Sequence, residues 1–222
     1  MISSNELLKN LYQKSLNDFQ CFTDKFSEEC LHGPLLINPK AYYGQETKLL
    51  IIGQETYGWA SEYTDINAQI SCYEEFNVGE NYVSSPFWNV TRKVERLLNI
   101  EPYSCAWSNL NRFDHNGGSP VGDVELEIPQ FDRILVDEIK ILKPDICLFY
   151  TNHKYDWRLK NIYDGLIMED IHGLPTKHFC KLSHPDLPFK SYRTPHPKTM
   201  RMQGWESQFI EYLTNMNGAS FA

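Results

Sequence analysis

The sequence predicts an α/β fold of three layers, in which helices cover both faces of a central, mainly parallel sheet of four strands. Residues 49–52 are an apolar run that is too short for a helix and ends at Gly53, which favours a buried strand. Residues 145–150 form a second apolar run, of the kind buried in parallel sheets. Such runs alternate with segments of helical pattern, and this alternation is typical of the α/β class.

Two local signals mark helix starts. Ser3 and Glu6 have the spacing of a capping box. Ser85 can cap a second helix that has Pro86 at its first position. The expected elements are helices at residues 3–21, 85–98, 129–142 and 202–216, strands at 49–53, 104–109, 145–150 and 177–182, and loops at 24–47, 59–84 and 112–128.

The composition suits one domain, residues 1–222, with the helix and irregular segment of residues 1–47 packed on the rest. The net charge of −8 argues against a general nucleic-acid coat, although residues 151–205 hold nine Lys and Arg against five Asp and Glu. A polyanion such as DNA could therefore bind the basic part, weakly and with strong salt sensitivity, and from the charge alone an uneven surface without a partner is an equally good explanation.

Nothing in the sequence points to a membrane or to a cofactor. No apolar run approaches the roughly 18 residues of a membrane helix, and the N-terminus lacks a signal-peptide pattern. The six Cys are scattered and form no paired motif, which suits reduced thiols. We therefore expect a cytoplasmic protein with no cofactor and no membrane partner.

Polar residues follow three of the predicted strands, at residues 53–55, 108–111 and 151–153. The carboxyl ends of parallel strands share one edge, where ligands bind in open α/β sheets, so these clusters are expected to converge. Gln54, Glu55 and Tyr57 are then at the site, with Glu55 as the candidate catalytic carboxylate. Taken alone, a single Glu after a strand is more often an ordinary solvated residue.

His196 lies between two prolines that favour an extended loop. A neutral His held there can donate a hydrogen bond to a developing negative charge, and basic neighbours suit an anionic ligand. Those neighbours are Arg193, Lys198 and Arg201. His184 precedes a proline in the same way but has fewer basic neighbours.

In their order and spacing, these motifs resemble the uracil-DNA glycosylase superfamily over about residues 49–213. Residues 53–58 read Gly-Gln-Glu-Thr-Tyr-Gly, where the family has Gly-Gln-Asp-Pro-Tyr-His. Residues 196–200 read His-Pro-Lys-Thr-Met, where the family has His-Pro-Ser-Pro-Leu. The family's Asn at the end of the next strand falls on Asn109. The resemblance implies a divergent member with a uracil-DNA glycosylase-like sheet.

The resemblance also implies an activity, the hydrolysis of the N-glycosidic bond of uracil or another deaminated base that is flipped out of DNA. His196 would stabilise the charge on the leaving base, and Glu55 would stabilise the sugar cation and position the attacking water. Asn109, whose amide offers donors and an acceptor, would read the base edge.

The resemblance assigns further residues to substrate and DNA. Gln54 would hold the phosphate or the base through its backbone, Tyr57 would form a wall of the pocket, and Phe76 would stack on the base, with Tyr82 and Phe87 as alternatives. For DNA, Lys198 and Arg201 would meet phosphates, and Met200 would be an apolar wedge between base steps.

Two alternatives remain open. Glu55 replaces the family's Asp, which adds one methylene and moves the carboxylate. A displacement of about 1 Å can lower the rate roughly 100-fold. The second interpretation is therefore a catalytically altered nucleic-acid or nucleotide binding protein of the same fold. The third is a zinc site, for which the spacing matches no standard finger. Its ligands would be His172, His178, Cys180 and His184.

Overall fold

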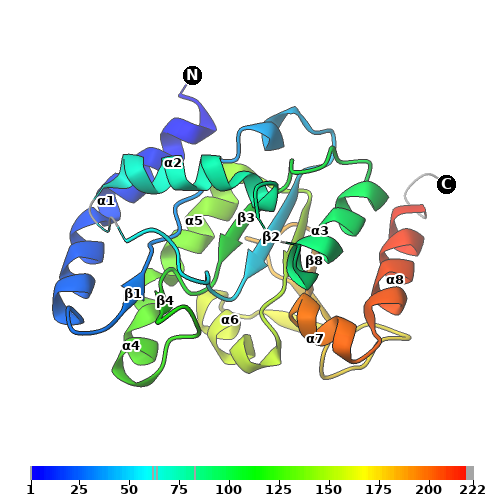
Figure 1. The fold of residues 1–222 in the computed structure, drawn as a ribbon. Coiled ribbons are helices and arrows are strands. Elements are labelled where there is room, and N and C mark those ends of the chain that lie inside the picture. Colours follow the sequence, from blue (N-terminus) through cyan, green and yellow to red (C-terminus); the bar gives the residue numbers. More distant parts are fainter. Residues whose placement is uncertain (1, 62, 64, 83, 219–222) are drawn as a thin grey trace.

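The structure is a computed structural model that describes residues 2–61, 63, 65–82 and 84–218. It confirms the α/β class: a mainly parallel central sheet is flanked by helices (Figure 1). In this view α1 (Ser4–Lys25) and α5 (Asp132–Leu142) lie to one side of the sheet, and α3 (Pro86–Leu97) and α8 (Glu206–Gly218) lie to the other. Buried apolar side chains from the sheet and from both groups of helices form one core.

The described residues form a central sheet of six strands rather than the predicted four. In spatial order these are β3 (Ala106–Asn109), β2 (Leu49–Gly53), β5 (Ile146–Phe149), β8 (Lys190–Arg193), β7 (Cys180–Ser183) and β6 (Ile167–Asp170). The first four run parallel, and β7 and β6 extend the sheet by antiparallel pairing. The carboxyl ends of the four parallel strands therefore meet at one edge.

The prediction of a strand at residues 177–182 is confirmed in part, because the fourth parallel strand of the sheet is β8, which was not predicted. That segment overlaps β7, which runs antiparallel to β8. β8 reads Lys-Ser-Tyr-Arg and has no apolar run that could mark it as a buried strand. Its position is decided by pairing with β5, in which Arg193 lies opposite Phe149.

The capping signals in the sequence predict the helix starts correctly. The Glu6 amide donates to Ser3 Oγ, and Glu6 accepts from the Ser3 amide, which together form the predicted capping box of α1. Ser85 Oγ accepts from the Trp88 amide at the start of α3. A 3-10 turn at Ile128–Phe131 precedes α5, so this helix begins close to the expected residue.

Three segments predicted as loops contain regular structure. β1 (Leu31–His32) pairs with β4 (Asp114–His115), α2 (Ile66–Phe76) lies within residues 59–84, and α4 (Gly122–Glu127) lies within residues 112–128. Residues 62, 64 and 83 of the long segment lie outside the described residues. The helices α6 (Asp156–Ile162) and α7 (Pro197–Met202) are also additional to the prediction. The helices α4, α6 and α7 are short, and α2 buries Gln69 among its apolar residues, so their apolar periodicity is weak.

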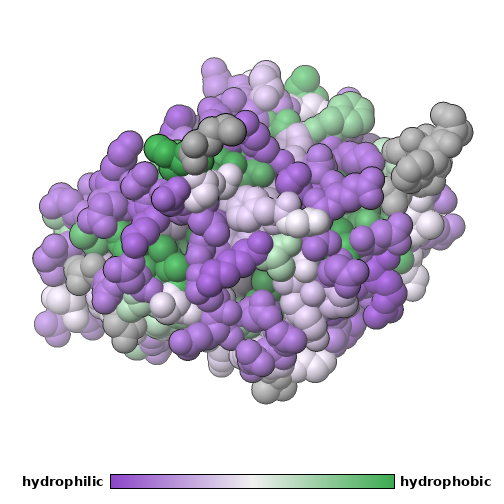
Figure 2. All heavy atoms as spheres, turned by 90° about the horizontal axis from the view of Figure 1, so that it is seen from above, coloured by the Kyte–Doolittle hydropathy of each residue, from purple (hydrophilic) through white to green (hydrophobic). Residues whose placement is uncertain are grey.

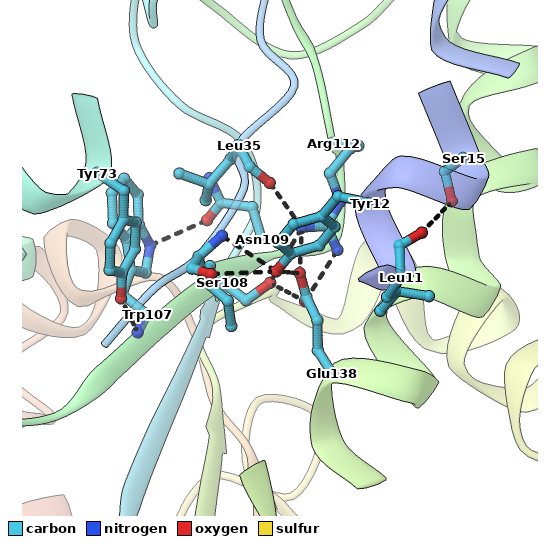
Figure 3. A network of polar contacts seen from close by, with 11 residues as sticks. Leu11, Tyr12, Ser15, Leu35, Tyr73, Trp107, Ser108, Asn109, Arg112 and Glu138 are labelled. Carbon is cyan, nitrogen blue, oxygen red and sulfur yellow. Dashed lines mark hydrogen bonds and ion pairs between the residues drawn. The ribbon is translucent and has the colours of Figure 1, made fainter. Parts of the chain in front are cut away.

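A buried ion pair ties the end of β3 to the helices (Figure 3). Arg112 and Glu138 form two parallel contacts, at 2.9 and 3.0 Å. Tyr12 Oη and Ser108 Oγ donate to the same carboxylate at 2.8 and 2.7 Å, and burial together with Glu138 raises the pKa of Tyr12. Because Tyr12, Ser108 and Glu138 come from α1, β3 and α5, the network fixes the carboxyl end of β3 against two helices.

Figure 2 shows the molecule from above, relative to Figure 1, so that the amino ends of the parallel strands face the reader. Hydrophilic residues predominate on this face, and hydrophobic residues form small separate patches. Within the described part of the chain, no helix combines the length and the apolar character that crossing a membrane requires.

Candidate active site

A cleft of about 570 Å³ opens at the carboxyl edge of the parallel strands. Its lining comes from the loop after β2, the start of α3, the segments after β5 and β8, and several aromatic residues. The lining residues used below are Gln54, Glu55, Tyr57, Trp59, Phe76, Tyr82, Phe87, Trp88, Trp107, Asn152, Lys154, His196 and Lys198.

The polar clusters at the strand ends converge as predicted. The Asn111 amide donates to the Gln54 carbonyl oxygen at 2.7 Å, which joins the ends of β3 and β2. Gln54 Nε2 donates to the Thr151 carbonyl oxygen at 3.1 Å, which joins β2 to β5. The Asn152 amide donates to the Thr194 carbonyl oxygen at 3.0 Å, which brings the His196 segment to the same edge.

Glu55 is half-buried in the cleft, and both of its carboxylate oxygens are held. Asn111 Nδ2 donates to Oε2 at 2.9 Å, and Ser119 Oγ donates to Oε1 at 2.7 Å. Asn111 is buried, and Arg158 Nη1 donates to its Oδ1 at 2.5 Å. The carboxylate is therefore oriented by groups that are themselves fixed in the core.

Asp114 holds the loop that carries Glu55. Its fully buried carboxylate accepts from Thr56 Oγ1 at 2.6 Å and from the amides of Gly58 and Trp59 at 3.0 and 3.2 Å. The other oxygen accepts from the Gly117 amide at 2.9 Å and lies 2.8 Å from His32 Nδ1. One carboxylate therefore sets the path of the loop beside Glu55 and that of the facing turn.

His196 caps α7 and faces the same cleft. Its Nδ1 accepts from the Lys198 amide at 3.2 Å, so a neutral ring carries its proton on Nε2. Burial, with Lys198 and Lys154 nearby, lowers the pKa of His196 to about 4. At neutral pH the ring is thus an uncharged donor, in agreement with the expectation from the sequence.

One wall of the cleft is aromatic. The three predicted stacking candidates, Phe76, Tyr82 and Phe87, all line it. Phe76 packs against Trp59 and Trp107 at centroid distances of 5.5 and 5.4 Å. The ring centroids of Phe87 and His196 are 5.7 Å apart, so this candidate contacts the histidine.

Tyr57 lines the cleft as predicted, but its side chain is 84% exposed. It therefore stands at the mouth of the cleft instead of forming an inner wall. The inner aromatic lining includes Trp59, Trp88 and Trp107, which sequence reasoning missed. They come from a loop, a helix and a strand, so no local pattern joins them.

Asn109 does not lie with Glu55 and His196 on the cleft surface. The residue is 1% exposed, and its Oδ1 accepts from Trp107 Nε1 at 3.1 Å. Trp107, two residues earlier on the same face of β3, lines the cleft instead. Asn109 is therefore buried behind the cleft surface, and its predicted role as reader of a base edge stays a prediction that this arrangement does not support directly.

The three predicted DNA-binding residues have different surroundings. Lys198 is exposed and lines the cleft. Arg201 Nε donates to Glu206 Oε2 at 2.7 Å, so its charge is paired within the protein. Met200 is fully buried, because the short helix α7 turns it towards the core, so the prediction of an apolar wedge at this position is wrong.

Two basic residues near His196 also differ from expectation. Arg193 is buried and paired with Asp156, and it donates to the Lys177 carbonyl oxygen, so it does not face an anionic ligand. Lys154, which sequence reasoning missed, is exposed in the cleft with its Nζ 3.5 Å from Ser119 Oγ. Its position directly after the third polar cluster was the available signal.

The zinc alternative has no support in the arrangement of its residues. Across the described ranges, no group of three or more His, Cys, Asp and Glu side chains is placed to hold a metal ion. His178 instead packs against His153 and Trp205, at centroid distances of 5.2 and 4.7 Å. The four residues named for this site therefore do not form a group of ligands.

A comparison of the chain with models of protein families and with curated proteins found no match. The function proposed below therefore rests on the residues and geometry of the cleft.

Proposed function

We propose that this protein is a base-excision glycosylase of uracil-DNA glycosylase-like fold, which hydrolyses the N-glycosidic bond of uracil or another deaminated base flipped out of DNA. One observation carries the proposal: Glu55 and His196 line the same cleft beside an aromatic wall, and His196 is neutral and able to donate a hydrogen bond. A base inside a duplex is unreachable, and a flipped base needs a pocket in which it can stack.

The two groups suit the charges that develop when the bond breaks. The bonding electrons leave with the base, so the base becomes negative and the sugar positive. The His196 Nε2 proton can be donated in a hydrogen bond to the departing base. Glu55, with both oxygens oriented, can stabilise the sugar cation and take a proton from the attacking water.

The rest of the cleft supports base binding. Phe76 and Phe87 offer ring faces or edges for stacking, and Gln54 lies at the end of β2 beside Glu55. Tyr57 stands at the mouth, where it can cover a bound sugar. Lys198 offers a positive charge to a phosphate.

A second function, binding of a nucleic acid or nucleotide without cleavage, is favoured by one specific observation. Asn109 is buried, and its Oδ1 accepts a hydrogen bond from Trp107, which lines the cleft in its place, so the proposed base-reading amide is not exposed to a ligand. The longer carboxylate at Glu55 adds to this reading.

A cleavage assay separates the two functions. Purified protein is incubated with labelled single- and double-stranded oligonucleotides that carry one uracil or hypoxanthine, and alkali reveals abasic sites. We expect cleavage that falls at least about 100-fold in both Glu55→Gln and His196→Ala, the usual size of general acid–base contributions.

Matched controls are Glu125→Gln and His172→Ala, which change exposed residues outside the cleft and should keep the wild-type rate. Absence of cleavage by folded protein on every substrate would reject the glycosylase. Measurable binding of the same oligonucleotides would then favour the second function.

A further inference from the structure

Four arginines at or after the carboxyl ends of β3, β5 and β8 are paired with carboxylates of the protein. Each has a carboxylate partner at an N–O distance of 2.5–2.9 Å. The pairs are Arg112 with Glu138, Arg158 with Asp132, Arg193 with Asp156, and Arg201 with Glu206. These guanidinium groups therefore hold the fold together and are not free to meet a row of phosphates.

Two lysines supply the positive charge of the cleft. Of the described residues that line it, only Lys154 and Lys198 are basic apart from His196, and only Glu55 is acidic. Lys154 Nζ lies 3.5 Å from Ser119 Oγ, which donates to Glu55. Lys198 follows His196 in the chain by two residues and donates its amide to that ring. Lys154 is thus linked to Glu55 through Ser119, Lys198 is linked to His196 through its backbone, and both positive charges lie close enough to the His196 ring to lower its pKa.

The dimensions of the cleft suit one nucleotide. A volume of about 570 Å³ is within the range of sites for a single small ligand. The aromatic wall can hold one base, and the net charge of −8 on the chain opposes the approach of a long polyanion. Specific duplex binders, by contrast, neutralise on the order of 6–10 phosphates.

We propose that the cleft recognises a single nucleotide unit with one phosphate on each side of its sugar, met by Lys154 and Lys198. A nucleoside 3′,5′-bisphosphate is the smallest complete ligand of this class, and further strand adds little affinity. This substrate class rests on the proposed function, since it places the same base and glycosidic bond between Glu55 and His196.

The test compares ligands of increasing length in the Glu55→Gln protein, which removes turnover. The probes are deoxyuridine 3′,5′-bisphosphate, a 12-nucleotide single strand and a 12-base-pair duplex, the last two with one central deoxyuridine. Binding is measured by calorimetry from 50 to 200 mM NaCl. We expect the bisphosphate to bind within about 10-fold of the single strand. The plot of log K against log salt for the single strand should have a slope of about −1.4, from two contacts at about −0.7 each.

Charge removal checks the two lysines separately. Lys154→Ala and Lys198→Ala should each flatten the slope by about 0.7. Lys160→Ala, which removes an exposed lysine of α6 outside the cleft lining, is the matched control and should leave the slope unchanged. A slope of −4 or steeper, or more than 100-fold tighter binding of the 12-mers than of the bisphosphate, would overturn the proposal.

Cleavage by the wild-type protein distinguishes the two proposals. Duplex cleavage combined with a steep salt slope keeps the glycosylase and rejects the single-nucleotide class. Binding of the bisphosphate with the two-lysine slope, but without cleavage of any substrate, keeps the ligand class and rejects the glycosylase. Failure of all three probes to bind rejects the ligand class, and cleavage by the wild type then decides on the glycosylase by itself.

Discussion

Asn111 Nδ2 lies 2.9 Å from Glu55 Oε2 and donates a hydrogen bond to it. The orientation of this amide is decided on its other side, where Arg158 donates to Oδ1. Arg158 is in turn held by both oxygens of Asp132, at 2.9 Å each. A buried chain of charged and polar groups therefore determines which atom of Asn111 faces the proposed catalytic carboxylate.

Replacing Asn111 with Asp tests this positioning. Asn111→Asp keeps an acceptor for Arg158 but removes the donor to Glu55 and sets a second carboxylate beside it. We expect the turnover number to fall at least about 10-fold, and the acidic limb of the pH–rate profile to move to higher pH. An exposed control, Asn161→Asp, should do neither. A profile that keeps its shape while stability drops would reduce Asn111 to a structural residue.

The lowered pKa of His196 makes the free energy of unfolding depend on pH. The pKa is about 4 in the folded protein and about 6.5 in an unfolded chain, so the unfolded state binds more protons between these values. The free energy of unfolding should therefore decrease as the pH falls from 6.5 to 4, by roughly 2–3 kcal/mol from this residue.

Urea denaturation at pH 7 and pH 4.5 measures how much stability the protein loses over this pH interval. His196→Asn, which retains a capping side chain, should lose less stability over this interval than the wild type. His172→Asn, at an exposed position, should follow the wild type. Equal pH dependence in wild type and His196→Asn would contradict a depressed pKa at His196.

The Asp114 carboxylate should be irreplaceable by an amide. Asp114→Asn turns one acceptor oxygen into an NH₂ group, which faces donors such as Thr56 Oγ1 or the Gly117 amide. We expect a loss of about 2–4 kcal/mol in the free energy of unfolding, because several charged hydrogen bonds fail together. Hydrogen exchange at the Gly58 and Trp59 amides should accelerate, whereas the exposed change Asp18→Asn should affect neither quantity. Unchanged protection of these two amides would show that the loop does not depend on Asp114.

The buried pair of Arg112 and Glu138 should behave differently from a surface pair. Glu138→Leu leaves a buried guanidinium unpaired, so we expect a loss of about 3–5 kcal/mol. The double change Arg112→Met with Glu138→Leu should recover a large part of this loss, because no buried charge remains. Denaturant titrations of the single and double variants measure the coupling between the two residues.

The control for this cycle is the surface pair of exposed Arg133 and half-buried Asp137 on α5, at 3.2 Å. Asp137→Ala should change the free energy of unfolding by less than about 1 kcal/mol. If the single and double core variants are equally unstable, the cost lies in packing and not in the isolated charge.

Local chemistry explains which elements were predictable. Ser3 with Glu6, and Ser85 with Pro86, mark helix starts through bonds within a few residues. The apolar runs of β2 and β5 identify strands that are buried on both faces. β8 has no such run, and its burial results from strands that are distant in the sequence, so it was missed.

The candidate site divides along the same line. Glu55 and His196 were predictable because each follows a segment that ends at the carboxyl edge of the sheet. The burial of the Met200 side chain was not predictable, because it depends on the short helix α7 that His196 caps. The burial of Asn109 was not predictable either, since Trp107 can cover it only when loop and helix aromatics close the same wall.

By itself, the sequence determined the α/β class, the helix caps and the convergence of polar residues at one sheet edge, because each depends on short-range pattern or on the direction of parallel strands. Tertiary structure alone decided which charges remain free. Arg193 and Arg201 form ion pairs with Asp156 and Glu206, whereas Lys154 and Lys198 are exposed in the cleft. The physical reason is that these charges pair between different elements, Arg193 with a residue 37 positions away and Arg201 with the first residue of the next helix, so pairing depends on how the elements pack in three dimensions.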